Sequence, residues 1–178
     1  MTQRVIAFVG ISGVGKSTFL RAAAKLITFQ HLVAGSLIGT ARETEHEHDR
    51  LRLQNIDQNQ QLLVKGFHLK KDAGSRLVVL DGHAIIDGAE GVQTVSEQVF
   101  ASVGTDAIVH LAADPRQILA NRKGDRSRDR PTLSVNELAA HQARSLAAAI
   151  DIGRSLSIPF RLFSHMDVSG FCAFAASL

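Results

Sequence analysis

A glycine-rich, phosphate-binding pattern near the N-terminus constrains the fold of this chain more than any other feature. Residues Gly10–Ser17, which read GISGVGKS, match G-x-x-x-x-G-K-[ST] between the apolar run Val5–Val9 and the helical run Thr18–Leu26. Glycines let the backbone wrap a phosphate chain with its N–H groups, at the positive end of a new helix. A strand, a phosphate loop and a helix are therefore predicted in that order. The predicted nucleotide contacts are Gly10, Ser12, Gly13, Val14, Gly15, Lys16, Ser17 and Thr18.

Such a loop works with a lysine and a magnesium ion, and the chain offers residues for both. Lys16 is expected to reach the β- and γ-phosphates, and Ser17 to ligate Mg²⁺. The apolar run Leu77–Asp81 ends in a carboxylate, as a second magnesium ligand requires, although a strand-end aspartate can also cap a helix or form a turn. We therefore predict Mg²⁺ coordination by Ser17 and Asp81, with His83 as a local hydrogen-bonding residue rather than a catalyst.

Five short apolar runs alternate with helical patterns along the 178 residues. The runs are nearly continuous, which is typical of strands covered on both faces. Strand–helix alternation favours a parallel sheet with right-handed crossovers. We predict a three-layer α/β fold in one domain, residues 1–178, around a five-stranded parallel sheet. The predicted strands are Arg4–Val9, Leu32–Gly35, Arg76–Leu80, Asp106–Ala112 and Pro159–Phe163.

Three segments carry helix-start signals. Asp114 before Pro115 is typical of an N-cap followed by proline at the first helical position. Thr94–Glu97 and Ser134–Glu137 both match the capping-box pattern. A helix is predicted to begin at each of these points.

Composition excludes several classes of protein. A formal net charge of only +3, with no Trp or Tyr to stack bases, argues against a general nucleic-acid binder, and no apolar run approaches the roughly 18 residues of a membrane span. The few residues before the phosphate loop leave no room for a signal peptide. A single cysteine, Cys172, cannot form an internal disulfide, which favours the cytoplasm. The expected partner is a small-molecule nucleotide, with the oligomeric state left open.

Arginine supplies 14 of the 20 Lys and Arg residues, and clustered arginine suits bidentate recognition of phosphate. Residues 122–133 form a polar, arginine-rich segment between two predicted helices. The segment predicts a short mobile lid that neutralises charge on the transferred group, although it can also be a solvated loop of balanced charges. The predicted catalytic arginines are Arg122, Arg126, Arg128 and Arg130.

Residues 36–72, between the second and third predicted strands, are the predicted insertion that binds the phosphoryl acceptor. Arg42, Arg50 and Arg52 are available for an acceptor phosphate, although solvated helix faces also carry arginine. His46 and His48 lie in the same insertion and are interpreted as part of a solvated polar face rather than as metal ligands.

Two other classes with this loop fit less well. Small GTPases read guanine with Asn-Lys-x-Asp after a strand, whereas Asn121–Asp125 reads Asn-x-Lys-x-Asp and follows a helical pattern. Motor and transporter ATPases usually bring further domains, for which 178 residues leave little room. The sequence therefore favours a small phosphotransferase.

Three further motifs accompany the phosphate loop: Val78–Ile86, Ala112–Leu119 with the arginine-rich lid, and His141-Gln142 before an alanine-rich helix. Together they resemble archaeal-type adenylate kinases, which are P-loop nucleoside monophosphate kinases. The resemblance implies the strand order 2-3-1-4-5 and Mg²⁺-dependent transfer of the ATP γ-phosphoryl group to a nucleoside monophosphate, with AMP as the first candidate. It also implies a phosphate role for Lys16 and an acceptor-phosphate contact for Arg52.

The chain departs from that family after Ile86. A Gly-Tyr-Leu-Pro-Gly-Leu-Pro-like stretch near the acceptor is replaced by Asp87–Gln93, which is acidic and glycine-rich. We expect the acceptor pocket to be lined by Arg42, Arg52, Asp81 and Asp87.

Two rival functions stay open. A kinase of the same fold could act on a nucleoside, a sugar acid or a modified nucleotide, and would need a carboxylate base near Asp81 or Asp87. A nucleotide-dependent regulatory ATPase would bind a protein partner and hydrolyse ATP slowly, with water as its acceptor.

Overall fold

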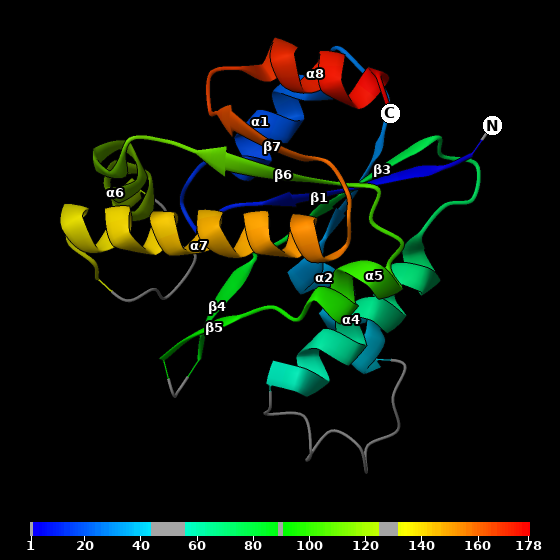
Figure 1. Ribbon diagram of the computed structural model, residues 1–178, viewed down its shortest axis with the longest axis horizontal. Helices are drawn as coiled ribbons and strands as arrows, with labels where there is room; N and C mark the ends of the chain where they lie inside the picture. The colour runs from blue at the N-terminus through cyan, green and yellow to red at the C-terminus, as the bar shows by residue number, and fades with distance from the viewer. Residues whose placement is uncertain (1, 44–55, 89–90, 125–131) are drawn as a thin grey trace.

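Five parallel strands form the central sheet of the computed structural model, which describes residues 2–43, 56–88, 91–124 and 132–178. They are β1 (Arg4–Val9), β2 (Gln30–Val33), β3 (Leu77–Asp81), β6 (Ala107–Ala112) and β7 (Phe160–Ser164). Their order across the sheet is β2-β3-β1-β6-β7 (Figure 1). Every neighbouring pair runs parallel, so the carboxyl ends of β1, β2 and β3 meet at one edge.

Counted among the parallel strands alone, this order is 2-3-1-4-5, as the resemblance implies. The labels differ because an antiparallel hairpin, β4 (Ile85–Gly88) with β5 (Gly91–Thr94), intervenes as a separate two-stranded sheet. The sequence analysis missed this hairpin, because its strands are only four residues long and rich in glycine. The predicted strand Leu32–Gly35 was wrong in its bounds: β2 ends at Val33, opposite Asp81, and Ala34 begins a helix.

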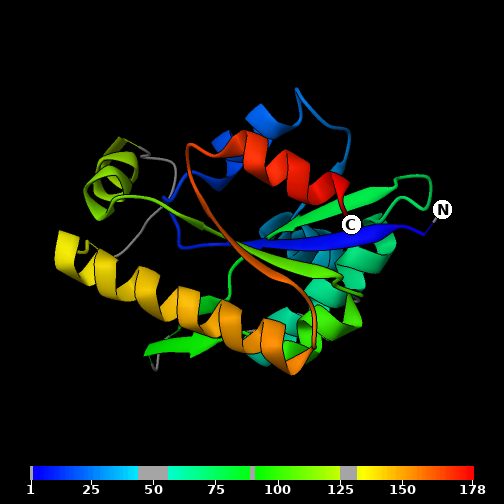
Figure 2. The same ribbon diagram turned by 45° about the horizontal axis from the view of Figure 1, so that its top comes forward.

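Helices cover both faces of the sheet, which confirms the three-layer α/β fold (Figure 2). On one face, α1 (Lys16–Ala23) packs against α8 (Val168–Ala176). The other helices are α2 (Ala34–Glu43), α4 (Ile56–Lys70), α5 (Glu97–Ser102), α6 (Pro115–Gly124) and α7 (Val135–Ser155). Of these, α4, α5 and α7 lie on the opposite face, and α6 packs against α7 beyond the end of β6.

Aromatic rings fill the core between the sheet, α1 and α8. Phe8, Phe19 and Phe171 are all buried, and their ring centroids lie 5.3 to 5.6 Å apart. Phe163 adds an edge-on contact to Phe171 at 6.1 Å. The apolar C-terminal segment is therefore an integral layer of the core, because α8 closes this face of the sheet.

Helix starts follow local chemistry in two of the three predicted places. Ser134 and Glu137 form the predicted capping box at the start of α7, and Asp114 accepts a hydrogen bond from the Arg116 amide at 2.7 Å. The predicted capping box Thr94–Glu97 was wrong, because Thr94 pairs with Ile85 in the hairpin and Ser96 is the N-cap of α5. Tertiary pairing therefore outweighed the local pattern there.

Helices α2 and α4 cross at Gly66, where a methyl group would collide with the backbone of Leu37. Replacing Gly66 with alanine should lower the free energy of unfolding by about 1–3 kcal/mol, since backbone cannot move aside as a side chain can. Gly39 on α2 is the matched control, because a Cβ there meets open space and should stabilise the helix by up to about 1 kcal/mol. Urea denaturation of both variants measures the two effects; equal midpoints would contradict the close crossing.

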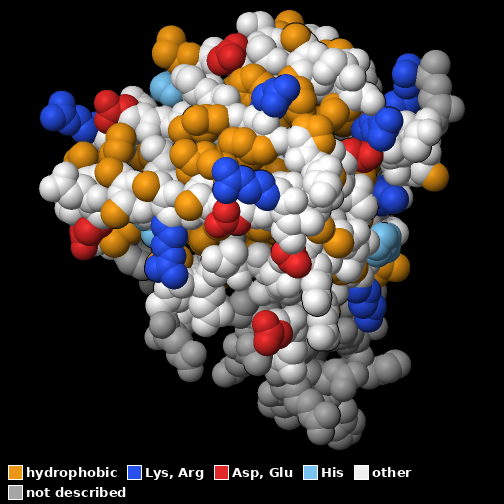
Figure 3. Space-filling view, in the orientation of Figure 1, with side chains coloured by type: hydrophobic (Ala, Val, Ile, Leu, Met, Phe, Trp, Pro, Cys, Tyr) orange, Lys and Arg blue, Asp and Glu red, His pale blue; other side chains and the backbone are white. Residues whose placement is uncertain are grey.

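Hydrophobic side chains gather on the face that carries β7, between α7 and α8 (Figure 3). As an edge strand, β7 leaves Leu162 49% exposed. Within the described parts of the chain, no helix has the length and apolar character needed to cross a bilayer.

Candidate active site

The predicted phosphate loop joins β1 to α1 at the carboxyl ends of the parallel strands, where ligands bind in open α/β sheets. Gly13 and Gly15 have φ angles of 89° and 102°, in the left-handed region that suits glycine. Gly15 is the N-cap of α1 and, in the described structure, no side chain caps this position. The first amides of α1 therefore face outward as potential donors to an anion.

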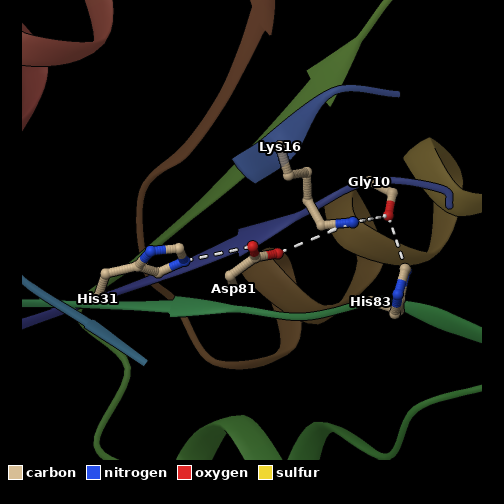
Figure 4. A network of polar contacts seen from close by, with 5 residues as sticks. All are labelled: Gly10, Lys16, His31, Asp81 and His83. Carbon is tan, nitrogen blue, oxygen red and sulfur yellow. Dashed lines mark hydrogen bonds and ion pairs between the residues drawn. The ribbon is translucent and has the colours of Figure 1, made fainter. Parts of the chain in front are cut away.

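Lys16 folds back onto the loop and lies beside the strand-end carboxylate (Figure 4). Its Nζ donates to the carbonyl oxygen of Gly10 at 2.9 Å and lies 3.8 Å from Oδ1 of Asp81. His83 places Nδ1 2.8 Å from the same carbonyl oxygen. Because a carbonyl only accepts, His83 carries its proton on Nδ1, in the local hydrogen-bonding role that the sequence suggests. Lys16 is thus held within reach of both the loop and Asp81.

Asp81 is buried at the end of β3, with cationic or N–H groups on two sides. Besides Lys16, His31 on β2 directs Nε2 toward Oδ2 of Asp81 at 3.3 Å. A buried carboxylate needs such partners, because desolvation without them is costly. Sequence reasoning missed His31; its only signal was a polar residue within the short run Gln30–Val33.

The oxygen donors at this position suit Mg²⁺. Ser17 and Asp81 both line the same cleft, and the described residues contain no cluster of three or more His, Cys, Asp or Glu that would cage a metal. Mg²⁺ keeps several waters and is usually held by one or two protein oxygens together with substrate phosphates. One hydroxyl and one carboxylate match that requirement.

A cleft of about 1220 Å³ surrounds the loop. That volume exceeds the roughly 300–1,000 Å³ of a typical small-molecule site, so two ligands have room. On one side of the loop the cleft is lined by α6 and the start of α8, including Gln117, Asn121 and His165. On the other side it is lined by α2, α4, α5 and the hairpin, including Ile38, Gln60 and Phe100. The second compartment is called the acceptor compartment below.

Helix α6 supports the loop from the first side. Asn121 donates from Nδ2 to the Gly13 carbonyl oxygen at 2.9 Å. The Arg122 side chain lies so close that a Cβ on Gly13 would meet its Cγ at 2.6 Å. The asparagine of the guanine-like sequence pattern therefore contacts the loop backbone. Arg122 belongs to α6, so the predicted lid, residues 122–133, begins within this helix.

Two predicted acceptor residues do not line the cleft. The Arg42 guanidinium is exposed and donates to Oδ1 of Asn59, which does line it. Asp87 lies on β4, 3.8 Å from Nε2 of His141 on α7. Asp87 therefore faces α7 rather than the cleft. The predicted residues that lie outside the described parts of the chain are His46, His48, Arg50, Arg52, Arg126, Arg128 and Arg130.

A buried histidine lies behind the loop, and the sequence analysis did not single it out. His110 on β6 is fully buried, and its Nε2 lies 3.1 Å from Oγ of Ser145 on α7. Within the described structure, its Nδ1 has no hydrogen-bond partner. Burial, reinforced by the positive charge of Lys16, lowers the pKa of His110 from 6.5 to about 4.

This shift predicts a loss of stability in acid. In the unfolded chain His110 takes up a proton near pH 6.5, and in the folded chain only near pH 4. Between these values protonation favours the unfolded chain, so the free energy of unfolding falls as the pH falls. We expect the wild type to lose about 3 kcal/mol more than His110→Asn between pH 7 and pH 4. Urea denaturation at both pH values measures the difference, and parallel losses in the two proteins would contradict it.

Comparisons with known proteins agree with this geometry. Adenylate kinase from Thermococcus kodakarensis is 29% identical over 154 residues, which cover 82% of this chain and 78% of that protein. Adenylate kinase from Thermococcus onnurineus is 29% identical over 175 residues, covering 93% and 88%. The solved shikimate kinase from Bacteroides thetaiotaomicron has a TM-score of 0.58 at 13% identity, over 98% of this chain and 97% of that one.

The parallel sheet, the glycine loop and Lys16 beside Asp81 define a P-loop kinase, and the resemblance to archaeal adenylate kinases is confirmed. The chain is similar in sequence to adenylate kinases, over most of its length. The family model described as "AAA domain" matches residues 9–139, and the chain belongs to that family.

Proposed function

We propose that the protein transfers the γ-phosphoryl group of ATP to a nucleoside monophosphate, with AMP as the first acceptor to test. The observation that carries the proposal is the cleft, which extends to both sides of Lys16 and Asp81. A donor nucleotide on the α6 side and an acceptor on the α4 side would meet at these two residues. The adenylate kinase relatives support this choice of acceptor class.

Phosphoryl transfer mainly requires the protein to position the donor and the acceptor and to neutralise the charge on the phosphates. In our proposal the loop amides from Gly10 to Thr18 hold the donor phosphates, and Lys16 turns from the Gly10 carbonyl to the β- and γ-phosphates. Ser17 and Asp81 would hold Mg²⁺, which would supply neutralisation of the negative charge on the phosphates. The predicted arginines assist: Arg122, Arg126, Arg128 and Arg130 at the lid, with Arg52 near the acceptor phosphate, whereas Arg42 is engaged with Asn59 at the wall of the cleft.

The carboxylates favour a phosphate acceptor over a hydroxyl acceptor. Among the described residues, Asp81 is the only carboxylate that lines the cleft, and Asp87 faces His141 instead. A hydroxyl acceptor needs a base, so Asp81 would have to serve as base and metal ligand together. A monophosphate brings its own anionic oxygen and needs no base. The cytoplasm is the compartment we propose, because Cys172 is the only cysteine of the chain.

Incubation with Mg-ATP and a panel of nucleoside monophosphates tests the proposal, with products separated by ion-exchange chromatography. We expect ADP together with a new nucleoside diphosphate from at least one monophosphate. Slow release of ADP that no monophosphate accelerates would overturn it in favour of a regulatory ATPase.

A further inference from the structure

Two neighbouring amide side chains on α4, Asn59 and Gln60, line the acceptor compartment. We propose that these two side chains present only hydrogen-bond donors to the ligand, and we call the pair the reading edge. The site then selects an acceptor base that offers lone pairs, on ring nitrogens or keto oxygens, to these donors. This inference rests on the proposed function, because it names the chemistry of the same acceptor.

The orientation of the Gln60 amide is set by its partner. The Ser96 backbone N–H lies 3.1 Å from the Gln60 side-chain oxygen Oε1, at the start of α5. A backbone N–H can only donate, so the oxygen of this amide must face Ser96. The Nε2 group is then the free end of the amide, and it has no protein partner among the described residues. Gln60 is only 9% exposed, and it lines the cleft.

The same reasoning sets the Asn59 amide. Its partner is the Arg42 guanidinium on α2, which donates to Oδ1. Guanidinium has no acceptor, so the oxygen of Asn59 must face Arg42 and Nδ2 is the free end. Nδ2 likewise has no protein partner among the described residues. Two neighbouring side chains therefore offer N–H donors, and both of their oxygens are already occupied.

The surrounding wall is apolar. Leu63 lies one turn further along α4, and Ile38, Val99 and Phe100 line the same compartment. A flat heteroaromatic ring fits against an apolar wall of this kind. If the ligand leaves one of the two amide donors without an acceptor, that donor loses its water and gains no partner, which weakens binding. Ligand edges with lone pairs satisfy Gln60 and Asn59, whereas an exocyclic amine meets only like donors. We therefore expect 6-oxo purine monophosphates to be accepted at least as well as 6-amino ones.

The test compares AMP with inosine 5′-monophosphate, which differ at C6 by amino against keto and at N1 by a lone pair against an N–H, so that the C6–N7 side of the inosine base carries lone pairs only. Gln60→Glu keeps the shape and the oxygen on Ser96 but replaces the free donor with an acceptor. We expect it to shift the ratio of kcat/KM for AMP over the inosine nucleotide by about tenfold or more toward AMP. Gln61→Glu is the matched control, because Gln61 is exposed and does not line the cleft. It should leave the ratio unchanged.

Asn59→Asp gives a second variant that retains Arg42 as a partner, now as an ion pair, and should shift the ratio in the same direction. Circular dichroism melts identify any variant that fails to fold, and the ratio itself is insensitive to the folded fraction. An unchanged ratio in the folded Gln60→Glu and Asn59→Asp proteins would overturn the inference while leaving the proposed function intact.

Equilibrium titration of AMP and the inosine nucleotide by calorimetry distinguishes failure of this inference from failure of the proposed function. Binding that shifts between wild type and Gln60→Glu, without any phosphoryl transfer, would overturn the proposed function and support the reading edge. If neither nucleotide binds to the wild type, both are overturned.

Discussion

Replacing Lys16 with alanine should lower kcat for phosphoryl transfer by about 10²–10³-fold or more, the usual cost of removing one group that stabilises transition-state charge. Lys16 is the only lysine or arginine among the described residues that line the cleft. Its Nζ lies between the Gly10 carbonyl oxygen and Asp81, where the phosphates of a bound donor would replace the carbonyl as partner.

Initial rates with Mg-ATP and the accepted monophosphate, under saturating conditions, measure this effect. Lys25→Ala is the control, because Lys25 is exposed just after α1 and its loss removes the same charge at a distance from the cleft. Asp81 keeps His31 as a partner in the Lys16 variant, so a folded protein is expected and a circular dichroism melt verifies it. Activity near the wild-type level would refute the assignment of the phosphate loop.

Truncating Phe171 to alanine should lower the free energy of unfolding by about 3–5 kcal/mol, a large part of the 5–15 kcal/mol that holds a typical domain together. The ring is fully buried and contacts Phe8, Phe19 and Phe163. Three elements, β1, α1 and β7, therefore lose contacts at once. Neighbouring groups belong to the sheet and to α1, so the resulting cavity cannot collapse easily.

Urea denaturation at neutral pH measures the loss. Phe174→Ala is the matched control on the same helix: Phe174 is only partly buried and stacks against the Arg161 guanidinium, 5.3 Å from the ring centroid. We expect this control to cost about 1 kcal/mol, in the range of ordinary substitutions. A similar loss in both variants would contradict the central place of Phe171 in this core.

The sequence by itself determined the features that depend on neighbouring residues. The apolar run, the glycines and Lys16 of the phosphate loop follow one another without a gap, and the order of the five parallel strands along the chain followed from the apolar runs. The capping box of α7 was predictable because Ser134 and Glu137 are three residues apart. Short-range geometry of this kind is encoded locally, since backbone hydrogen bonding has only a few solutions.

Only the tertiary structure decided which side chains meet across elements. His31 reaches Asp81 from 50 residues away, Gln60 accepts from Ser96 across 36 residues, and His110 meets Ser145 across 35. The same packing turned Thr94 from a predicted cap into a strand residue and placed Asp87 beside His141 of α7 rather than in the cleft. No local pattern carries these contacts, because they arise when strands separated in sequence pair in one sheet and the helices close over it.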